Sequence, residues 1–147
     1  MALPPYLTLE IVTPERAIVH EEVDEVQIPG SEGYLGILPG HTPLLTSLKV
    51  GQFWYRKGTE KFYLSIAFGF AEILPDRVRV LADIAERAEE IDVRRAEAEK
   101  HRAEEAIQAA SLRKDQVQME HDLERARASL MKAMIRLQVA TKSRMRM

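Results

Sequence analysis

The chain has 147 residues, a net charge of −2 and no cysteine. This length suits one ordinary domain or a small domain with an appendage, and the lack of cysteine excludes disulfides and thiolate metal sites and fits a reducing compartment. The start of the chain lacks the pattern of an export signal, and no stretch approaches the about 20 apolar residues of a membrane helix. We therefore expect a soluble protein, or one that is at most peripheral to a membrane.

Composition and charge change sharply along the chain. Every Gly and every Pro precedes residue 76, whereas the remainder is rich in Ala, Glu, Arg, Leu and Met. Residues 1–90 carry 8 basic against 14 acidic side chains, and residues 91–147 carry 13 basic against 9 acidic ones. This pattern predicts two different architectures, and the basic second part favours an anionic partner.

In the first part, apolar and polar residues tend to alternate. Leu7, Leu9 and Ile11 are separated by polar residues, and Val78 and Val80 are separated by an arginine. Three short aromatic and aliphatic runs lie between them, at residues 51–56, 61–68 and 69–74. A period of two is typical of half-buried strands, so we predict an antiparallel β-sandwich of about 85 residues.

In the second part the period changes to that of a helix. One apolar stripe recurs at steps of three and four: Met119, Leu123, Ala126, Leu130, Met134 and Leu137. A thinner, alanine-rich stripe precedes it: Ile91, Ala96, Ala103, Ile107 and Ala110. These stripes predict two helices packed antiparallel, with Asp115 and Gln118 as a capping pair at the start of the second. A single long helix over residues 91–141 is the alternative.

A catalytic or metal site finds little support. His20 is followed by Glu21 and Glu22, but the two-histidine spacing of a helical metal site is missing. Residues 30–41 are glycine-rich, yet no Lys-Ser or Lys-Thr follows to hold phosphate and magnesium. We expect neither a metal centre nor an active site in this chain.

The start of the helical part permits two interpretations. Asp92, Arg95 and Arg102 share one helix face, where two guanidiniums could bind a polyphosphate and the carboxylate an amino group. Equally, Glu99 lies four residues after Arg95 and three before Arg102, so a solvated ion network would satisfy the same charges. In that second interpretation Asp92 caps the helix.

The end of the chain is basic. After Glu124 the sequence holds no acid, only seven basic residues: Arg125, Arg127, Lys132, Arg136, Lys142, Arg144 and Arg146. Some of these complement a helix macrodipole and need no partner. Because aromatic residues for base stacking are missing after residue 90, an acidic protein surface is favoured over nucleic acid.

Four segments together resemble a known family. "LTLEIVTPER", "VQIPGSEGYLGILPGHTPLL", "VLADIAERAEEID" and "KAMIRLQVA" are similar to the epsilon subunit of the bacterial and chloroplast rotary ATP synthase. The resemblance implies a sandwich of about ten strands in residues 1–87 and a C-terminal helical hairpin in residues 88–147. It also implies a noncatalytic subunit with no required cofactor, on the cytoplasmic face of the bacterial inner membrane.

In this family the segment equivalent to residues 30–45 meets the gamma subunit and the polar loops of the membrane rotor ring. The resemblance thus implies a docking role for six residues: Tyr34, Leu35, Ile37, Leu38, Pro39 and His41. For Leu35, Ile37 and Leu38, a place in the domain core is the favoured alternative. Contact with the membrane would be indirect, through the complex.

The family's hairpin acts as a brake on ATP hydrolysis. When it extends, basic residues of the second helix meet acidic segments of the catalytic subunits. The resemblance assigns that contact to Arg125, Arg127, Lys132 and Arg136. A subunit that serves assembly alone, with a hairpin that never extends, is another reading.

Some members also bind ATP in the folded hairpin as a regulatory ligand. Their motif matches seven residues here: Glu86, Ile91, Asp92, Arg95, Arg102, Lys132 and Arg136. Lys132 stands where ATP-binding relatives often have Arg, and so lacks the bidentate fork. The alternative from another functional class is a free nucleotide-binding sensor or a basic interaction module.

Overall fold

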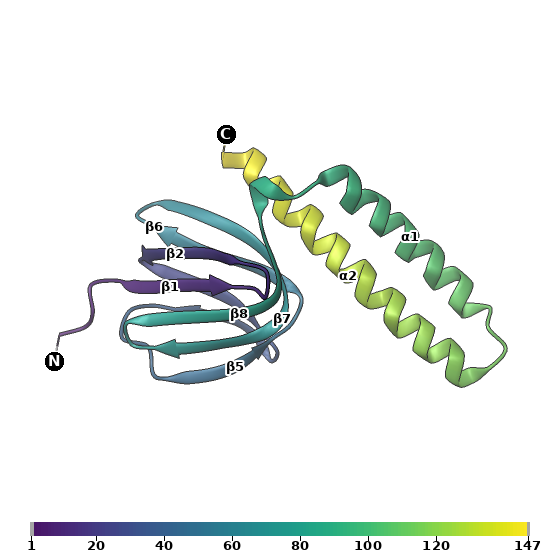
Figure 1. Cartoon of the computed structure of the whole chain (residues 1–147), viewed down its shortest axis with the longest axis horizontal. Coiled ribbons are helices and arrows are strands. Elements are labelled where there is room, and N and C mark those ends of the chain that lie inside the picture. Colours follow the sequence, from purple (N-terminus) through teal and green to yellow (C-terminus); the bar gives the residue numbers. More distant parts are fainter. Residues whose placement is uncertain (1, 147) are drawn as a thin grey trace. The chain divides into compact units, whose positions relative to one another are not determined.

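The chain forms two compact units in the computed structural model. The model describes residues 2–146, with side chains as far as residue 143, and the units are Met1–Ala88 and Glu89–Met147. The first unit is built of strands, and the second holds two long helices (Figure 1). Among the described residues, no helix has the length and apolar character that crossing a membrane requires.

The strands of the first unit are β1 Leu7–Val12, β2 Ala17–Val23, β3 Glu25–Gly30, β4 Gly33–Ile37, β5 Leu44–Leu48, β6 Gly51–Lys57, β7 Glu60–Leu74 and β8 Arg77–Arg87. They pair in the order β2-β1-β8-β7-β5-β3-β4, and β6 pairs with both β3 and β7. A short 3-10 turn, η1 Ala88–Glu90, follows β8. The sandwich is therefore confirmed, with eight strands in the described chain rather than about ten.

One pairing is not antiparallel. β1 and β8 run in parallel, with Ile11 opposite Val80 and Leu9 opposite Val78. Apolar residues of one strand therefore lie opposite apolar residues of the other, and both sets point to the same inner face. The prediction of a wholly antiparallel sheet is wrong at this pair, which joins segments some seventy positions apart in the chain.

β7 is one long strand where the sequence suggested two. It bends at Phe68 and Gly69, whose φ angles are +62° and +125°. Before the bend it pairs with β6, and after the bend it pairs with β5, while β8 accompanies both parts. The bend thus carries one strand from one layer of the sandwich to the other.

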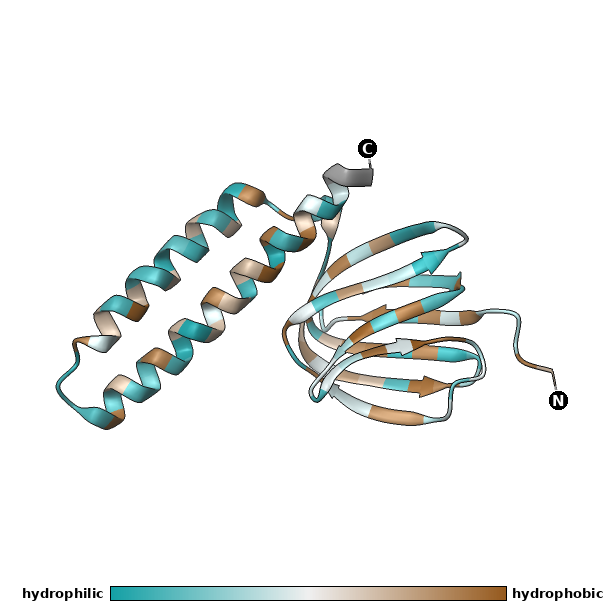
Figure 2. Cartoon of the chain, turned by 180° about the vertical axis from the view of Figure 1, so that it is seen from behind, coloured by the Kyte–Doolittle hydropathy of each residue, from teal (hydrophilic) through white to brown (hydrophobic). Residues whose placement is uncertain are grey.

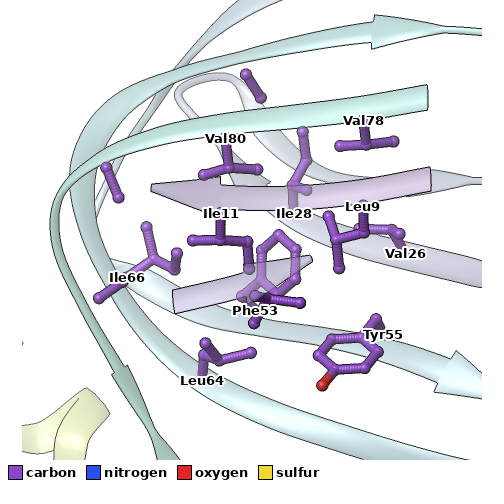
Figure 3. Packing of buried hydrophobic residues seen from close by; sticks show 14 of the residues in the cluster. Leu9, Ile11, Val26, Ile28, Phe53, Tyr55, Leu64, Ile66, Val78 and Val80 are labelled. Atoms are coloured by element: carbon purple, nitrogen blue, oxygen red, sulfur yellow. The ribbon is translucent and has the colours of Figure 1, made fainter. Parts of the chain in front are cut away.

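The core lies between these layers and is filled by side chains from all eight strands, some of which Figure 3 shows. The ten labelled residues are Leu9, Ile11, Val26, Ile28, Phe53, Tyr55, Leu64, Ile66, Val78 and Val80, all at most 1% exposed. Burying a large apolar side chain stabilises the folded state by about 1.5–3 kcal/mol. This unit therefore has a core of its own.

Tyr55 brings one polar group to the edge of this core. Its hydroxyl donates a 2.7 Å hydrogen bond to Glu21, which also pairs with Lys57, and its ring stacks on Phe62. Burial and this hydrogen bond raise the pKa of Tyr55, and the same hydrogen bond lowers the pKa of Glu21. The phenol therefore stays protonated and the carboxylate charged, which keeps the bond intact at neutral pH.

The second unit is a hairpin of α1 Val93–Ser111 and α2 Gln116–Arg146. The Asp115 carboxylate accepts hydrogen bonds from the backbone N–H groups of Val117 and Gln118, which starts α2. Two helices are therefore confirmed, and the single long helix is wrong.

The apolar stripes of the hairpin are thin. Along both helices, hydrophobic residues are separated by hydrophilic ones (Figure 2). Ala96, Ala103 and Ala110 of α1 and Ala126 of α2 are buried, but Met134 is 48% exposed, so its predicted place in the stripe is wrong. Small side chains let two helix backbones approach closely while burying little area.

Replacing Gly69 by Ala should strongly destabilise the sandwich. A Cβ atom there would lie 2.0 Å from the backbone oxygen of Leu81, in a φ region that L side chains rarely adopt. We expect a loss of about 3 kcal/mol, seen in thermal unfolding as a fall on the order of 15 °C. Gly36→Ala is the matched control, because a Cβ atom there meets nothing within 4 Å. Equal melting temperatures for the two variants would contradict this account.

Candidate functional site

Asp92 begins α1 and caps it. Its backbone is extended, with φ −80° and ψ 101°, and its carboxylate accepts a 3.1 Å hydrogen bond from the backbone N–H of Arg95. This is the geometry of an N-cap, so the capping interpretation of Asp92 is confirmed. The carboxylate nevertheless stays exposed, and its second oxygen remains open to other donors.

Glu99 connects the two helices through an ion network. One carboxylate oxygen lies 3.2 Å from Arg95 Nε, one turn earlier on α1, and the other lies 2.7 Å from an Arg136 nitrogen on α2. The Arg136 side chain is only 15% exposed, against 72% for Arg95. The predicted Arg95–Glu99 pair is confirmed, and Glu99 binds Arg136 rather than Arg102.

The sequence alone did not reveal this cross-helix pair. The partner of a charged residue across an antiparallel hairpin depends on the register of the two helices. A thin alanine stripe fits several registers almost equally well. The one available signal was that Arg136 lies three residues after Ala133, so the two occupy neighbouring positions on one face of α2.

A groove runs along the hairpin between α1 and α2, with a volume of about 560 Å³. Its floor consists of small residues: Ala103, Ala106, Ala109, Ala110, Ala126 and Ser129. Its charged lining has four cationic and two anionic side chains: Arg102, Arg113, Arg125, Lys132, Glu99 and Asp122. The groove exists because alanine methyl groups leave space that larger residues would fill.

Asp122 closes the end of the groove that lies toward the helical turn. Its carboxylate accepts hydrogen bonds from Gln118 at 3.1 Å and from Arg113, in the turn after α1, at 3.2 Å. The Gln118 amide and then the Arg113 guanidinium lower the pKa of Asp122. The carboxylate therefore stays ionised and its charge is already engaged by Arg113.

The basic residues of α2 do not lie on one face. Arg125 and Lys132 line the groove, and Arg136 pairs with Glu99. Arg127 is exposed and, two residues after Arg125, points away from that face because successive helix positions differ by about 100°. In the closed hairpin, three of the four residues predicted for the inhibitory contact therefore face α1. The side chains of Arg144 and Arg146 lie outside the described residues.

The residues predicted for ATP are distributed over several elements. Glu86 is on β8 of the first unit, and buried Ile91 precedes α1. Within the second unit, Glu99 joins Arg95 to Arg136, while Arg102 and Lys132 line the groove. Four cationic residues that were predicted to bind ATP thus lie on the inner face of the hairpin or in the first turn of α1: Arg95, Arg102, Lys132 and Arg136.

The glycine-rich segment of the first unit exposes some of its predicted docking residues and buries others. Tyr34 is 46% and Leu38 54% exposed, whereas Ile37 is fully buried in the core. Leu35 is half-buried against the core. The prediction that these residues lie in the domain core is thus confirmed for Ile37 and wrong for Leu38. From its buried position, the Ile37 side chain cannot contact a partner.

Several contacts hold that segment in place. The Tyr34 hydroxyl accepts a 3.1 Å hydrogen bond from the Gln52 backbone, and the Gly40 N–H donates one to Pro75. His41 Nδ1 lies 2.7 Å from the Thr42 carbonyl oxygen. Turns fixed in this way present Tyr34 and Leu38 on a firm surface.

Comparison with known proteins assigns both units. Residues 6–88 match the family model of the ATP synthase Delta/Epsilon chain, beta-sandwich domain, and residues 89–141 match that of its long alpha-helix domain. The chain belongs to the ATP synthase delta/epsilon family. The two family segments meet between residues 88 and 89, where the two compact units also divide.

Individual relatives support the assignment to this ATP synthase family. An ATP synthase epsilon chain of Dehalococcoides mccartyi is 50% identical over 138 residues, covering 94% of each chain. ATP synthase epsilon chain 2 of Syntrophotalea carbinolica is 47% identical over 134 residues, covering 91% of this chain and 93% of the relative. A chain in the mitochondrial ATP synthase of Euglena gracilis shares the fold, with a TM-score of 0.75 at 21% identity over 99% of this chain and 84% of that one.

Replacing Glu99 by Ala should loosen the family's helical hairpin in this chain. The substitution removes a contact between α1 and α2 and takes one carboxylate away from the largely buried Arg136. We expect a cost of about 1 kcal/mol, measured as roughly fivefold faster hydrogen exchange of amides in both helices. Glu97→Ala is the control, because Glu97 is exposed and forms no ion pair within residues 2–143. Equal exchange in both variants would show that Glu99 does not hold the hairpin closed.

Proposed function

We propose that this chain is a noncatalytic central-stalk subunit of ATP synthase that couples the gamma subunit to the membrane rotor ring. The observation that carries the proposal is the match of both family segments, in order, over residues 6–141. Relatives named ATP synthase epsilon chain cover more than nine-tenths of this chain at about half identity. The subunit would lie peripherally at the cytoplasmic face of a bacterial membrane.

The sandwich is the proposed docking unit. Tyr34 and Leu38 offer apolar surface on a segment that hydrogen bonds hold in place, and Leu45 of β5, the next strand along the chain, is 71% exposed. Apolar side chains on a firm loop are suited to a protein contact. We assign this surface to gamma and the rotor ring, with Ile37 supporting it from the core.

The hairpin is the proposed brake on ATP hydrolysis. Arg125, Lys132 and Arg136 face α1 in the closed form, so opening the hairpin would present them to another protein. Their positive charge suits acidic segments of the catalytic subunits. Since contacts between exposed charges are individually weak and screened by salt, such a brake would be reversible.

ATP is the proposed regulatory ligand of the closed hairpin. Arg95 and Arg136 already hold the carboxylate of Glu99 between them, which demonstrates that both guanidiniums can bind one anion. Asp92 keeps one oxygen open toward an amino group. A bound nucleotide would have to displace or share Glu99, which predicts modest affinity.

Removing residues 91–147 should raise ATP hydrolysis by the assembled complex. The truncated chain keeps the whole sandwich core, so it should still bind the stalk. The measurement is the steady-state ATPase rate of complexes reassembled with either the full-length or the truncated chain. An unchanged rate, with the truncated chain present in the complex, would refute the brake and leave the stalk role standing.

ATP should bind the isolated chain in an isothermal titration, and Asp92→Ala or Arg95→Ala should weaken binding at least tenfold. The controls are Asp115→Ala, which removes the cap of α2 rather than α1, and Arg94→Ala, which removes a neighbouring exposed cation. Both should bind as the wild type does. Absence of binding at millimolar ATP would contradict the nucleotide assignment. An equal loss of ATP affinity in the control variants would show that the chain attracts ATP only by nonspecific charge.

A further inference from the structure

The last part of β8 is paired along one side only. β7 pairs with β8 as far as Arg87, the last residue of the strand, whereas β1 pairs with it only from Arg77 to Leu81. In the part of the chain that the structure describes, residues 82–87 therefore have β7 as their one strand partner. Such an end opens more readily than a strand that is paired on both sides, unless a side chain holds it.

The Arg87 side chain supplies a contact of this kind. Its Nη2 atom donates a 2.7 Å hydrogen bond to the backbone oxygen of Ile18 on β2, although β1 separates β2 from β8 in the strand order. The positive charge of the guanidinium strengthens this bond, and its partly buried position limits competition from water. The end of β8 is thus tied to β2 by one side chain.

The sheet is irregular at the acceptor of this bond. The register of β1 and β2 shifts there, so that Ala17 and Val19 each lie opposite a residue of β1 but Ile18 does not. This is the pattern of a β-bulge, in which the extra residue is left unpaired in the ladder. Arg87 therefore bonds to a carbonyl group at a position where the ladder is interrupted.

The same guanidinium lies beside a polar pair that joins β2 to β6. The Tyr55 hydroxyl of β6 donates a 2.7 Å hydrogen bond to Glu21 of β2, and Lys57 donates one of 3.0 Å to the same carboxylate. The Tyr55 hydrogen bond, followed by Lys57 and Arg87, lowers the pKa of Glu21. Arg87 is thus close enough to act on this pair, so β2, β6 and the end of β8 meet in one polar cluster.

The charges of this cluster stay constant around neutral pH. The lowered pKa of Glu21 keeps its carboxylate ionised. Burial and the hydrogen bond to Glu21 raise the pKa of Tyr55, so the phenol keeps its proton. An arginine side chain remains protonated in proteins. The tie is therefore a lasting feature of the sandwich and does not depend on the titration of any of these groups.

Arg87 also lies where the chain leaves the sandwich. The first compact unit ends one residue later, at Ala88, and α1 begins at Val93 after the cap Asp92. Residues 88–92 are thus the whole connection between the tie and the first helix. If the end of β8 were free to open, a movement of the hairpin could also displace residues 82–87.

We propose that Arg87 is a positioning residue that fixes the pivot of the hairpin at residues 88–92. It holds the last residue of β8 against β2, so a movement of the hairpin changes the backbone after Arg87 and leaves β8 paired. This inference rests on the proposed movement of the hairpin and adds the place where the movement begins. A fixed pivot limits the directions that the hairpin can take, which lowers the entropic cost of its contact with the catalytic subunits.

Hydrogen exchange of the isolated full-length chain tests the tie. Arg87→Ala should speed exchange about tenfold at the amides of residues 82–87 and of their β7 partners, residues 64–67, because a charge-assisted hydrogen bond is lost. Exchange in β1 should stay within about twofold of the wild type, because opening of the β8 end is local. Arg79→Ala is the matched control: it removes an arginine of the same strand that pairs with Glu10, and it should leave residues 82–87 unchanged.

Arg87→Lys separates the role of the guanidinium from that of its charge. Lysine can still donate to the Ile18 oxygen but lacks the planar fork, so exchange should lie between that of the wild type and that of Arg87→Ala. This variant also provides the result if Arg87→Ala does not fold. Unchanged exchange at residues 82–87 would overturn the proposal, and so would equally faster exchange throughout the sandwich, which is the result of a merely structural role.

A distance measurement tests the pivot itself. Because the chain has no cysteine, single cysteines for spin labels can be placed at exposed Thr59 in the sandwich and exposed Lys114 in the helical turn. Arg87→Ala should broaden the distribution of distances between the two labels, and Arg79→Ala should not. A distribution of the same width in both variants would overturn the proposal.

The ATPase rate of reassembled complexes separates this inference from the proposed brake. If removal of residues 91–147 raises the rate, Arg87→Ala should raise it part of the way at equal occupancy of the complex, and Arg79→Ala should not. An unchanged rate with Arg87→Ala would then overturn the role of the pivot. If the truncation leaves the rate unchanged, the brake fails, and hydrogen exchange and label distances still decide whether Arg87 fixes the pivot.

Discussion

The close approach of α1 and α2 across alanine side chains is the constraint on which the behaviour of the hairpin depends. A buried methyl group stabilises by about 0.8 kcal/mol, against about 1.5–3 kcal/mol for a buried Leu or Ile. Ala103, Ala110 and Ala126 therefore hold the helices near each other without holding them firmly. The same small side chains leave the groove open, so the weak closure and the groove have one cause.

Charge also contributes to the closure of the hairpin. The Glu99–Arg136 contact lies near one end of the groove and the Arg113–Asp122 contact near the other. Each is worth about 1 kcal/mol or less where water reaches it, and salt or a competing ion weakens it. Anions and acidic surfaces can therefore weaken an interface that ion pairs hold together, whereas they would not weaken one packed with leucine.

The sandwich follows the opposite design. Leu9, Phe53 and Ile66 belong to a core of large, fully buried side chains drawn from several strands. Because the two units differ so much in buried apolar volume, they should also differ in the free energy of local opening. The proposed stalk subunit requires this difference, because its sandwich has to stay folded while it docks and its hairpin has to open.

Much of this architecture could be predicted from the sequence, because the spacing of apolar residues within each strand or helix matches the face that the element buries in the folded chain. The alternation around Leu9 and Val78 indicated strands, and the apolar steps along the second part indicated helices. Asp115 was predicted to cap a helix, and capping was one of two interpretations of Asp92; both residues cap a helix. Local chemistry decided these features, so a local pattern was enough to find them.

The features that the sequence did not reveal depend on how elements meet. The parallel pair of β1 and β8 joins distant segments, and the continuity of β7 requires Phe68 to adopt a φ angle that bulky residues rarely take. Likewise, Glu99 finds Arg136, and Arg102 and Arg125 border one groove, only in one register of the two helices. An alanine stripe does not fix that register in advance.

The position of the arginines on α2 finally links the proposed brake to the proposed ATP site. Arg136 faces α1 and pairs with Glu99, whereas Arg127 is exposed on another face of the helix, although both belong to one basic run. A guanidinium that forks onto the phosphates of ATP in the closed hairpin is not available to an acidic protein surface in the open one. The two partners would therefore compete for Arg136, and ATP would oppose the brake through the same side chain that the brake needs. Arg127 would take part in the protein contact alone.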